Sequence, residues 1–221
     1  MSTKAKNVVL ILLMLLTIAA IGLIVWRMLD DAAKERAHQR LLAEYPTAYT
    51  EWINQYASVY ELDPYLVTAI MRCESSNDAN AVSPKGAIGL MQIMPDTGAW
   101  IAHKLEEEPF DEAVLYDPET NIRFACWYIH FLDARLDGDV CSMIAAYNAG
   151  HGSVETWLAS TEYAMEGKLT KIPFPETERY VKKVSTALEN YMSLYPALYD
   201  GSALAGHSLP MLYLPESEAE D

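Results

Sequence analysis

The chain of 221 residues has little cysteine or histidine, the residues that build most metal centres. Its three cysteines, Cys73, Cys126 and Cys141, include no C-x-x-C pair, and its five histidines are scattered without ligand spacing. We therefore expect no metal site and no cofactor. Two interpretations of the thiols stay open. Either one disulfide forms in an exported domain and leaves one thiol over, or all three are small buried hydrophobic residues.

Positive charge is also scarce. The chain has 16 basic and 31 acidic residues, and the part after an apolar N-terminal run keeps 14 of the basic and all of the acidic ones, a net charge of −17. A protein that binds nucleic acid by neutralising phosphates needs a basic face, so this class is excluded. The same charge gives no attraction to an anionic membrane surface or wall polymer. A glycan ligand must therefore be held by the shape and the polar and aromatic walls of a groove.

The alternation of polar and apolar residues that is typical of strands is nearly absent, and no solenoid repeat appears. Asp63-Pro64 and Asp117-Pro118 each place an N-cap acceptor before a proline at the first helical position. Asp139 and Ser153 are further candidate caps. These signals predict an all-α fold, with an ordered loop at 77–95 and helices from 64, from 118 to about 136, at 139–147, at 153–157 and from about 176 to 194.

The longest apolar run extends from Val8 to Trp26 and has no charged residue. At the helical rise it spans roughly 28 Å, close to the thickness of a bilayer core. Lys4 and Lys6 precede the run, which predicts a cytoplasmic N-terminus and an exported remainder. A cleaved signal peptide is the alternative, but its apolar core is shorter, roughly 7–15 residues, and no small-x-small cleavage site follows Trp26. We therefore expect an uncleaved anchor.

The expected organisation has one globular domain with appendages on both sides. The tail is rich in Gly, Ser, Pro and acidic residues, a composition typical of disorder. The expected segments are a cytoplasmic N-terminus (1–7), a transmembrane anchor (8–29), a juxtamembrane stalk (30–47), a helical catalytic domain (48–196) and the acidic tail (197–221). The protein would then be single-pass in the cell membrane, with its catalytic domain outside the cytoplasm.

Glu74 is the candidate for chemistry. The helix that starts at Pro64 has its buried stripe at Leu66, Val67, Ile70 and Met71, and Glu74 continues this stripe at the C-terminal end. Burial and the negative end of the helix dipole both raise the pKa of a carboxyl group at such a place. A protonated carboxylic acid in an apolar cleft is what protonation of a glycosidic bond requires. An exposed glutamate at a frayed helix end is the alternative.

Four motifs follow one another along the chain. They are Glu-Ser at 74–75, Gly-Leu-Met-Gln at 89–92, Ala-Tyr-Asn-Ala-Gly at 146–150 and Glu-Thr-x-x-Tyr-Val at 176–181. In this order they resemble the family 1 lytic transglycosylases, whose catalytic domain has a goose-lysozyme-type fold. The resemblance covers about residues 52–195. Each motif alone is weak evidence, but four in order are strong.

The resemblance implies that Glu74 protonates the bond between N-acetylmuramic acid and N-acetylglucosamine in peptidoglycan. It implies that Tyr147 and Asn148 face Glu74 across the cleft, with the tyrosine hydroxyl placed to bond the acid or an N-acetyl group. Core packing is the alternative for Met91 and Tyr147. The residues expected to line the sugar groove are Ser75, Ser83, Met91, Gln92, Tyr147, Asn148, Glu176 and Tyr180.

The mechanism follows from the lack of a second acid in the first two motifs, since ordinary glycosidases use two carboxylates. The resemblance implies that the N-acetyl carbonyl of the muramic acid attacks its own anomeric carbon. Glu74 then accepts a proton from the C6 hydroxyl, and a 1,6-anhydro ring closes. The alternatives are a muramidase that hydrolyses the same bond and a non-catalytic glycan-binding scaffold. The expected partners are peptidoglycan strands and the membrane, while any partner in a cell-wall or secretion machine is unspecified.

Overall fold

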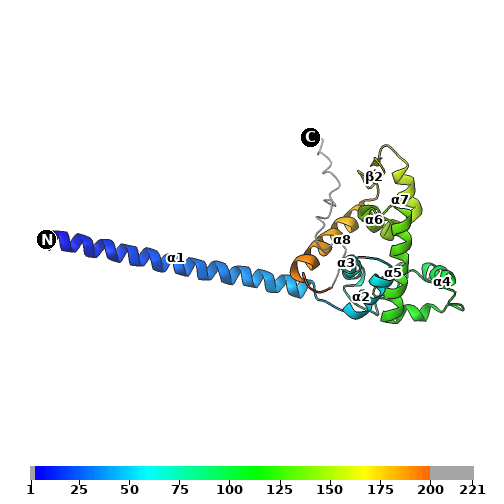
Figure 1. Ribbon diagram of the computed structural model, residues 1–221, viewed down its shortest axis with the longest axis horizontal. Helices are drawn as coiled ribbons and strands as arrows, with labels where there is room; N and C mark the ends of the chain where they lie inside the picture. Colours follow the sequence, from blue (N-terminus) through cyan, green and yellow to red (C-terminus); the bar gives the residue numbers. More distant parts are fainter. Residues whose placement is uncertain (1–2, 200–221) are drawn as a thin grey trace. The chain divides into compact units, whose positions relative to one another are not determined.

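The computed structural model describes residues 3–199, and its contacts divide the chain into two units, at 1–46 and 47–221. The expected acidic tail at 197–221 lies almost wholly outside the described residues. The second unit holds every motif of interest, and its described part, residues 47–199, has helices and one short hairpin as its regular structure (Figure 1). Its elements in chain order are α2 (Thr50–Val59), α3 (Pro64–Ser75), α4 (Pro95–Lys104), the 3₁₀ turn η1 (Glu112–Tyr116), α5 (Pro118–Arg135), α6 (Val140–Ala149), α7 (His151–Leu158), β1 (Ala164–Met165), β2 (Lys168–Leu169) and α8 (Pro175–Leu194).

The first unit is one long helix, α1 (Thr3–Glu44), which runs without a break through the expected anchor and most of the expected stalk. Large apolar side chains from Leu10 to Leu29 are exposed along it. Among residues 3–199, no helix meets the length and hydropathy expected of a membrane span.

The helix starts expected from aspartate caps are confirmed. Asp63 accepts a hydrogen bond from the backbone N–H of Tyr65 at 2.8 Å, and Asp117 accepts one from Thr120 N–H at 2.9 Å. Asp139 does the same at the start of α6. In each case a carboxylate satisfies a backbone donor that has no partner within its helix.

The cap expected at Ser153 is wrong. α7 begins at His151, directly after Gly150, whose φ of 81° turns the chain between α6 and α7. The Ser153 hydroxyl instead donates to the carbonyl of Ala149 at 2.9 Å. Because glycine adopts a positive φ without strain, the turn needs a single residue and leaves no room for a separate cap.

The three thiols are free, and no disulfide joins them. Cys126 is fully buried in α5 and Cys73 nearly so in α3, while Cys141 is half-buried. Burial raises the pKa of the Cys73 thiol to about 11 and that of Cys141 to about 12. They therefore match the interpretation in which they are small packing residues, inert as nucleophiles.

The core forms where α3 packs against α8 and α2, and where α6 packs against α8. Fully buried side chains at this centre include Ile70 and Met71 of α3, Val184 and Leu188 of α8, and Ile144 of α6. The apolar stripe expected on α3 is thus buried as predicted. Because α3 ends at Ser75, this packing holds its C-terminal turn, with Glu74, against α8.

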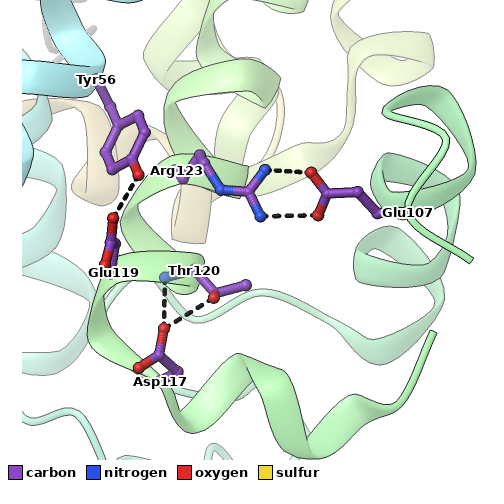
Figure 2. A network of polar contacts seen from close by, with 6 residues as sticks. All are labelled: Tyr56, Glu107, Asp117, Glu119, Thr120 and Arg123. Carbon is purple, nitrogen blue, oxygen red and sulfur yellow. Dashed lines mark hydrogen bonds and ion pairs between the residues drawn. The ribbon is translucent and has the colours of Figure 1, made fainter.

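A set of polar contacts ties α5 to its neighbours (Figure 2). Tyr56 of α2 donates to Glu119 at 2.7 Å. Arg123 forms a bidentate salt bridge with Glu107, a residue just after α4. Its two N–O distances are 2.6 and 2.7 Å. The first contact joins α2 to α5, and the second joins the segment after α4 to α5, the helix that also supports the site described below.

We expect Glu107→Gln to lower the free energy of unfolding by at most about 1 kcal/mol at neutral pH, because the pair is partly exposed. The hydrogen bonds from Arg123 lower the pKa of Glu107. A lowered pKa in the folded state adds stability that is lost as the pH falls through that value. Urea unfolding should therefore separate the variant from wild type at neutral pH and not at acid pH. Glu106→Gln, a neighbour with no ion pair within residues 3–199, is the control; an equal loss there would contradict the prediction.

Candidate active site

Glu74 lies in the last turn of α3, one residue before its end. Its carboxyl group is largely buried, and burial raises the pKa of Glu74 to about 7. The hydroxyl of Tyr180 and the charge of Lys183 act in the other direction and lower this pKa. Burial is the largest of the three effects, so near neutral pH the group is divided between its acid and its carboxylate form. Such a group both donates and accepts a proton readily.

Tyr180 is the direct partner of Glu74. Its hydroxyl donates to Glu74 Oε1 at 2.5 Å, a short hydrogen bond between residues 106 positions apart. Tyr180 lies in the second turn of α8, the helix against which α3 packs. Burial raises the pKa of Tyr180 well above its ordinary value, and the nearby Glu74 adds to this. The phenol therefore stays protonated and serves as a donor to the carboxylate.

Lys183 lies one turn further along α8 and binds the backbone beside the acid. Its ammonium group donates to the carbonyl of Cys73 at 2.8 Å. The carbonyls in the last turn of a helix have no partner within the helix and carry its partial negative charge. A cation at this place both satisfies one of them and stabilises the charged form of Glu74.

The Gly-Leu-Met-Gln motif forms a tight turn in the ordered loop that was expected between α3 and α4. Short antiparallel bridges pair Val82 with Ile88 and Ile88 with Ile93. Asn121 of α5 is completely buried beneath the turn and holds it from below. Its amide donates to the carbonyls of Ile88 and Leu115 and accepts from Met91 N–H at 2.8 Å.

Two polar residues of the loop that were expected in the groove are held by backbone contacts. Gln92 has a positive φ of 49°, and its side chain donates to the carbonyls of Ala81 and Gly89. The Ser83 hydroxyl accepts from Ala87 N–H at 2.9 Å. Both side chains are therefore held in place by the loop itself, so their orientation does not depend on a ligand.

A cavity of about 270 Å³ opens between the loop, α4, α5 and α6. Its polar lining comes from Gln92, Thr97, Tyr128, Tyr147 and Asn148, beside apolar side chains such as Ile101. This mixture of aromatic, amide and apolar groups without a charge suits a neutral polar ligand. Glu74 does not line the cavity.

Tyr147 connects the cavity to the acid, but through a different contact from the one expected. Its hydroxyl donates to the carbonyl of Met91 at 2.8 Å, whereas Tyr180 bonds Glu74. Burial, and then the charge of Glu74, raises the pKa of Tyr147 well above its ordinary value. Tyr147 is thus close enough for the charge of Glu74 to shift its pKa. Its hydrogen bond to Met91 joins α6 to the Gly-Leu-Met-Gln turn.

The other expected groove residues differ in their placement. The Met91 side chain is completely buried, which matches core packing. Asn148 is exposed and accepts a hydrogen bond from Thr177 at 2.8 Å. Glu176 is also exposed and lies 3.7 Å from the ammonium group of Lys85. The Ser75 hydroxyl donates to the Met71 carbonyl of its own helix, at 3.5 Å.

Sequence reasoning missed three residues of the site: Asn121, Tyr128 and Lys183. A signal for Asn121 existed, since it is a polar residue on the buried face of α5, between Asp117-Pro118 and the apolar Ile122. For Lys183 no signal existed, because an exposed lysine on α8 differs from its neighbour Lys182 only in the direction it points.

The comparisons with known proteins agree with this geometry. The family model "Transglycosylase SLT domain" matches residues 51–169, more than half of the chain. The chain belongs to this family. Its mostly helical, lysozyme-like fold is that of the SLT domain, as expected, and the short hairpin β1–β2 was not anticipated.

Two relatives show how much of a longer protein the similarity to this chain covers. It is 36% identical over 143 residues to the soluble lytic murein transglycosylase of Escherichia coli (strain K12), covering 63% of this chain and 22% of that protein. It is 31% identical over 168 residues to the membrane-bound lytic murein transglycosylase C of Actinobacillus pleuropneumoniae serotype 5b, covering 66% and 46%. The chain thus spans less than half the length of either relative.

Solved structures show the same likeness. The 70 kDa soluble lytic transglycosylase of Escherichia coli matches with a TM-score of 0.64 and 33% identity, over 75% of this chain and 27% of that one. An inactive glutamate-to-glutamine mutant of the lytic transglycosylase Slt from Pseudomonas aeruginosa matches with a TM-score of 0.62 and 30% identity, over 71% and 26%.

Proposed function

We propose that this chain is a peptidoglycan lytic transglycosylase in which Glu74 acts first as general acid and then as general base. The observation that carries the proposal is the state of Glu74, a largely buried carboxyl group with a pKa of about 7 and a phenol donor at 2.5 Å. Protonated, it supplies a proton to the glycosidic oxygen between N-acetylmuramic acid and N-acetylglucosamine. As a carboxylate stabilised by Tyr180, it accepts the proton of the sugar's C6 hydroxyl. The names of the relatives, and the inactive glutamate-to-glutamine mutant of one of them, support this assignment.

The surroundings of Glu74 favour anhydro-ring closure over hydrolysis. Within residues 3–199, the groups that shift the pKa of Glu74 are Tyr180 and Lys183, and no second carboxylate is among them. The one other motif acid, Glu176, is exposed and lies near Lys85. A hydrolase of this kind needs a second acid to activate water or form a covalent intermediate. The substrate's own N-acetyl carbonyl takes this role in our proposal.

Product analysis tests the proposal. Purified protein is incubated with peptidoglycan, and the released muropeptides are analysed by mass spectrometry. We expect muramic acid ends that are lighter by one water than reducing ends. Reducing ends would show hydrolysis and overturn the proposed mechanism, while a folded protein that releases nothing would overturn the proposed activity.

We expect Tyr180→Phe to move the alkaline limb of the pH–activity profile to higher pH. Loss of the hydroxyl removes a hydrogen bond that favours the charged carboxylate, so the pKa of Glu74 should rise above about 7. The protonated form of Glu74, which is the general acid, is lost as the pH rises through this pKa. A higher pKa therefore moves the alkaline limb to higher pH. Tyr147→Phe is the matched control, because its hydroxyl bonds Met91 and not Glu74. An unmoved limb in Tyr180→Phe would contradict the prediction.

We also propose that the apolar run at 8–29 anchors the chain in the cell membrane, with the SLT domain outside the cytoplasm. This part rests on the sequence, in which residues 8–26 carry no charge, and on relatives named as membrane-bound. Fractionation of cells that express the full chain tests it. We expect the protein in the membrane pellet after an alkaline carbonate wash and in the supernatant when residues 1–29 are deleted; release of the full chain by the wash would contradict it.

A further inference from the structure

A cluster of four aromatic side chains beside the cavity has no part in the proposed chemistry. We define it as the aromatic ridge: Trp100 of α4 and Trp127, Tyr128 and Phe131 of α5. The three rings of α5 share nearly one orientation, with interplanar angles to Phe131 of 8° for Trp127 and 15° for Tyr128. Trp100 lies across them, edge to face, with its centroid 5.0 Å from Phe131 and 5.1 Å from Trp127.

The aromatic ridge is continuous with the cavity. Tyr128 belongs to both, since it lines the cavity and its ring lies 5.7 Å from that of Tyr147. Ile101, the neighbour of Trp100 on α4, lines the cavity as well. On the other side Phe131 contacts the ring of His151, which directly follows the cavity residue Gly150. A ligand that leaves the cavity on this side meets the ridge next.

The rings differ in what they offer to a ligand. Phe131 is the packed centre, because Arg135 lies over its ring at 5.4 Å and the other rings surround it. Trp100, Trp127 and Tyr128 are each partly exposed, as is Phe131 itself. They are not among the buried residues of α4 and α5, so packing in the core does not explain why these positions are aromatic.

The polar atoms of these three rings are also unoccupied. Within residues 3–199, the indole N–H groups and the Tyr128 hydroxyl make no hydrogen bond to protein, and they are not among the buried atoms that lack a partner. These donors are therefore not fully buried, although burial of Tyr128 raises the pKa of its hydroxyl above the ordinary value. A flat apolar face with a donor at its edge is complementary to a pyranose ring, which has a C–H face and hydroxyl or N-acetyl groups around its rim.

We propose that the aromatic ridge extends the glycan groove and binds sugar residues of the strand beyond those in the cavity. The inference rests on the proposed function for the nature of the ligand. The ring of Trp100 lies 5.1 Å from that of Trp127 and 6.2 Å from that of Tyr128, so the three rings form one continuous aromatic surface. Arg135, the cation that lies over Phe131, is paired with Glu155 at 2.6 Å, so the ridge suits a neutral glycan better than an anionic lipid headgroup.

The test compares short and long substrates. Trp100→Leu and Trp127→Leu keep an apolar contact but remove the flat ring, and Trp52→Leu, a half-buried tryptophan of α2 stacked on Tyr49, is the matched control. For each variant, kcat/KM is measured on a GlcNAc–MurNAc tetrasaccharide and on the octasaccharide. We expect the ridge variants to lose about fivefold to tenfold on the octasaccharide and to stay within about twofold on the tetrasaccharide.

A second measurement separates this inference from the proposed function. Octasaccharide binding is measured by calorimetry in Glu74→Gln, with and without Trp127→Leu, and we expect the second change to weaken it about fivefold to tenfold. If wild type binds but does not cleave, the proposed function fails and the ridge is still tested. Equal binding with and without the ring, or equal losses on both substrates and in the Trp52→Leu control, overturns the ridge as a glycan site.

Discussion

Glu74→Gln is expected to reduce the rate of peptidoglycan cleavage by about a hundredfold to ten-thousandfold, the usual contribution of a general acid or base. Glutamine has nearly the same shape and keeps an acceptor for the Tyr180 hydroxyl, so the packing of α3 against α8 should survive. What it lacks is a proton to give to the glycosidic oxygen. The measurement is release of soluble muropeptides at neutral pH, with circular dichroism and thermal unfolding to show that the fold is intact.

Glu176→Gln is the control for this change. Glu176 lies in one of the four motifs and carries the same charge, but its side chain is exposed and lies near Lys85. We expect it to retain activity within a few-fold of wild type. Cleavage by Glu74→Gln at the wild-type rate would show that another group protonates the bond, and a large loss in Glu176→Gln would bring back a two-acid mechanism.

Gly89→Ala is expected to destabilise the SLT domain by more than about 3 kcal/mol, beyond the usual range for one substitution, because it creates a steric clash. A Cβ at this position would lie 2.4 Å from the Asn121 amide nitrogen and 2.4 Å from the Leu115 carbonyl oxygen. Neither atom moves easily, because Asn121 is fully buried and bonds three backbone groups. The close approach of the turn to α5 thus depends on the missing side chain. Urea unfolding followed by tryptophan fluorescence gives the loss.

Gly86→Ala separates this clash from backbone strain. Gly86 has a φ of +87°, close to the +80° of Gly89, but a Cβ there meets no atom within 4 Å. Both changes carry the strain of a positive φ, about 1 to 2 kcal/mol, and only Gly89→Ala adds the clash. Equal losses in the two variants would show that the contact with Asn121 contributes nothing.

Much of the fold could be predicted from local signals. The caps at Asp63, Asp117 and Asp139 determine where three helices begin, because a carboxylate and the next three or four backbone groups are enough to form each cap. The error at Ser153 arose from the same kind of reasoning. Both a serine cap and a glycine turn suit the sequence there, and the choice depends on how α6 and α7 meet.

The sequence named candidate residues of the site, but it did not predict which of them contact one another. The motifs name Glu74, Gln92, Tyr147 and Tyr180. The Tyr147 hydroxyl was expected to bond either the acid or an N-acetyl group, whereas in the structure it bonds Met91 and Tyr180 bonds the acid. Both tyrosines lie in motifs and are half-buried near Glu74, so no local property of the sequence distinguishes them. Burial of Met91 was equally undecided, since methionine is common both in cores and at binding surfaces.

The sequence by itself determined the helical class and the starts of the main helices, and it singled out Glu74 as the candidate acid. These depend on neighbours within a few residues, and a one-dimensional pattern records them. Only the tertiary structure decided that Tyr180 and Lys183 contact the end of α3, that Asn121 supports the Gly-Leu-Met-Gln turn, and that four aromatic rings cluster beside the cavity. These contacts join residues far apart in the chain, so they depend on the packing of α3 against α8 and of α4 against α5. The pKa of Glu74 belongs to this second group, because burial by distant residues raises it and their polar groups limit the rise.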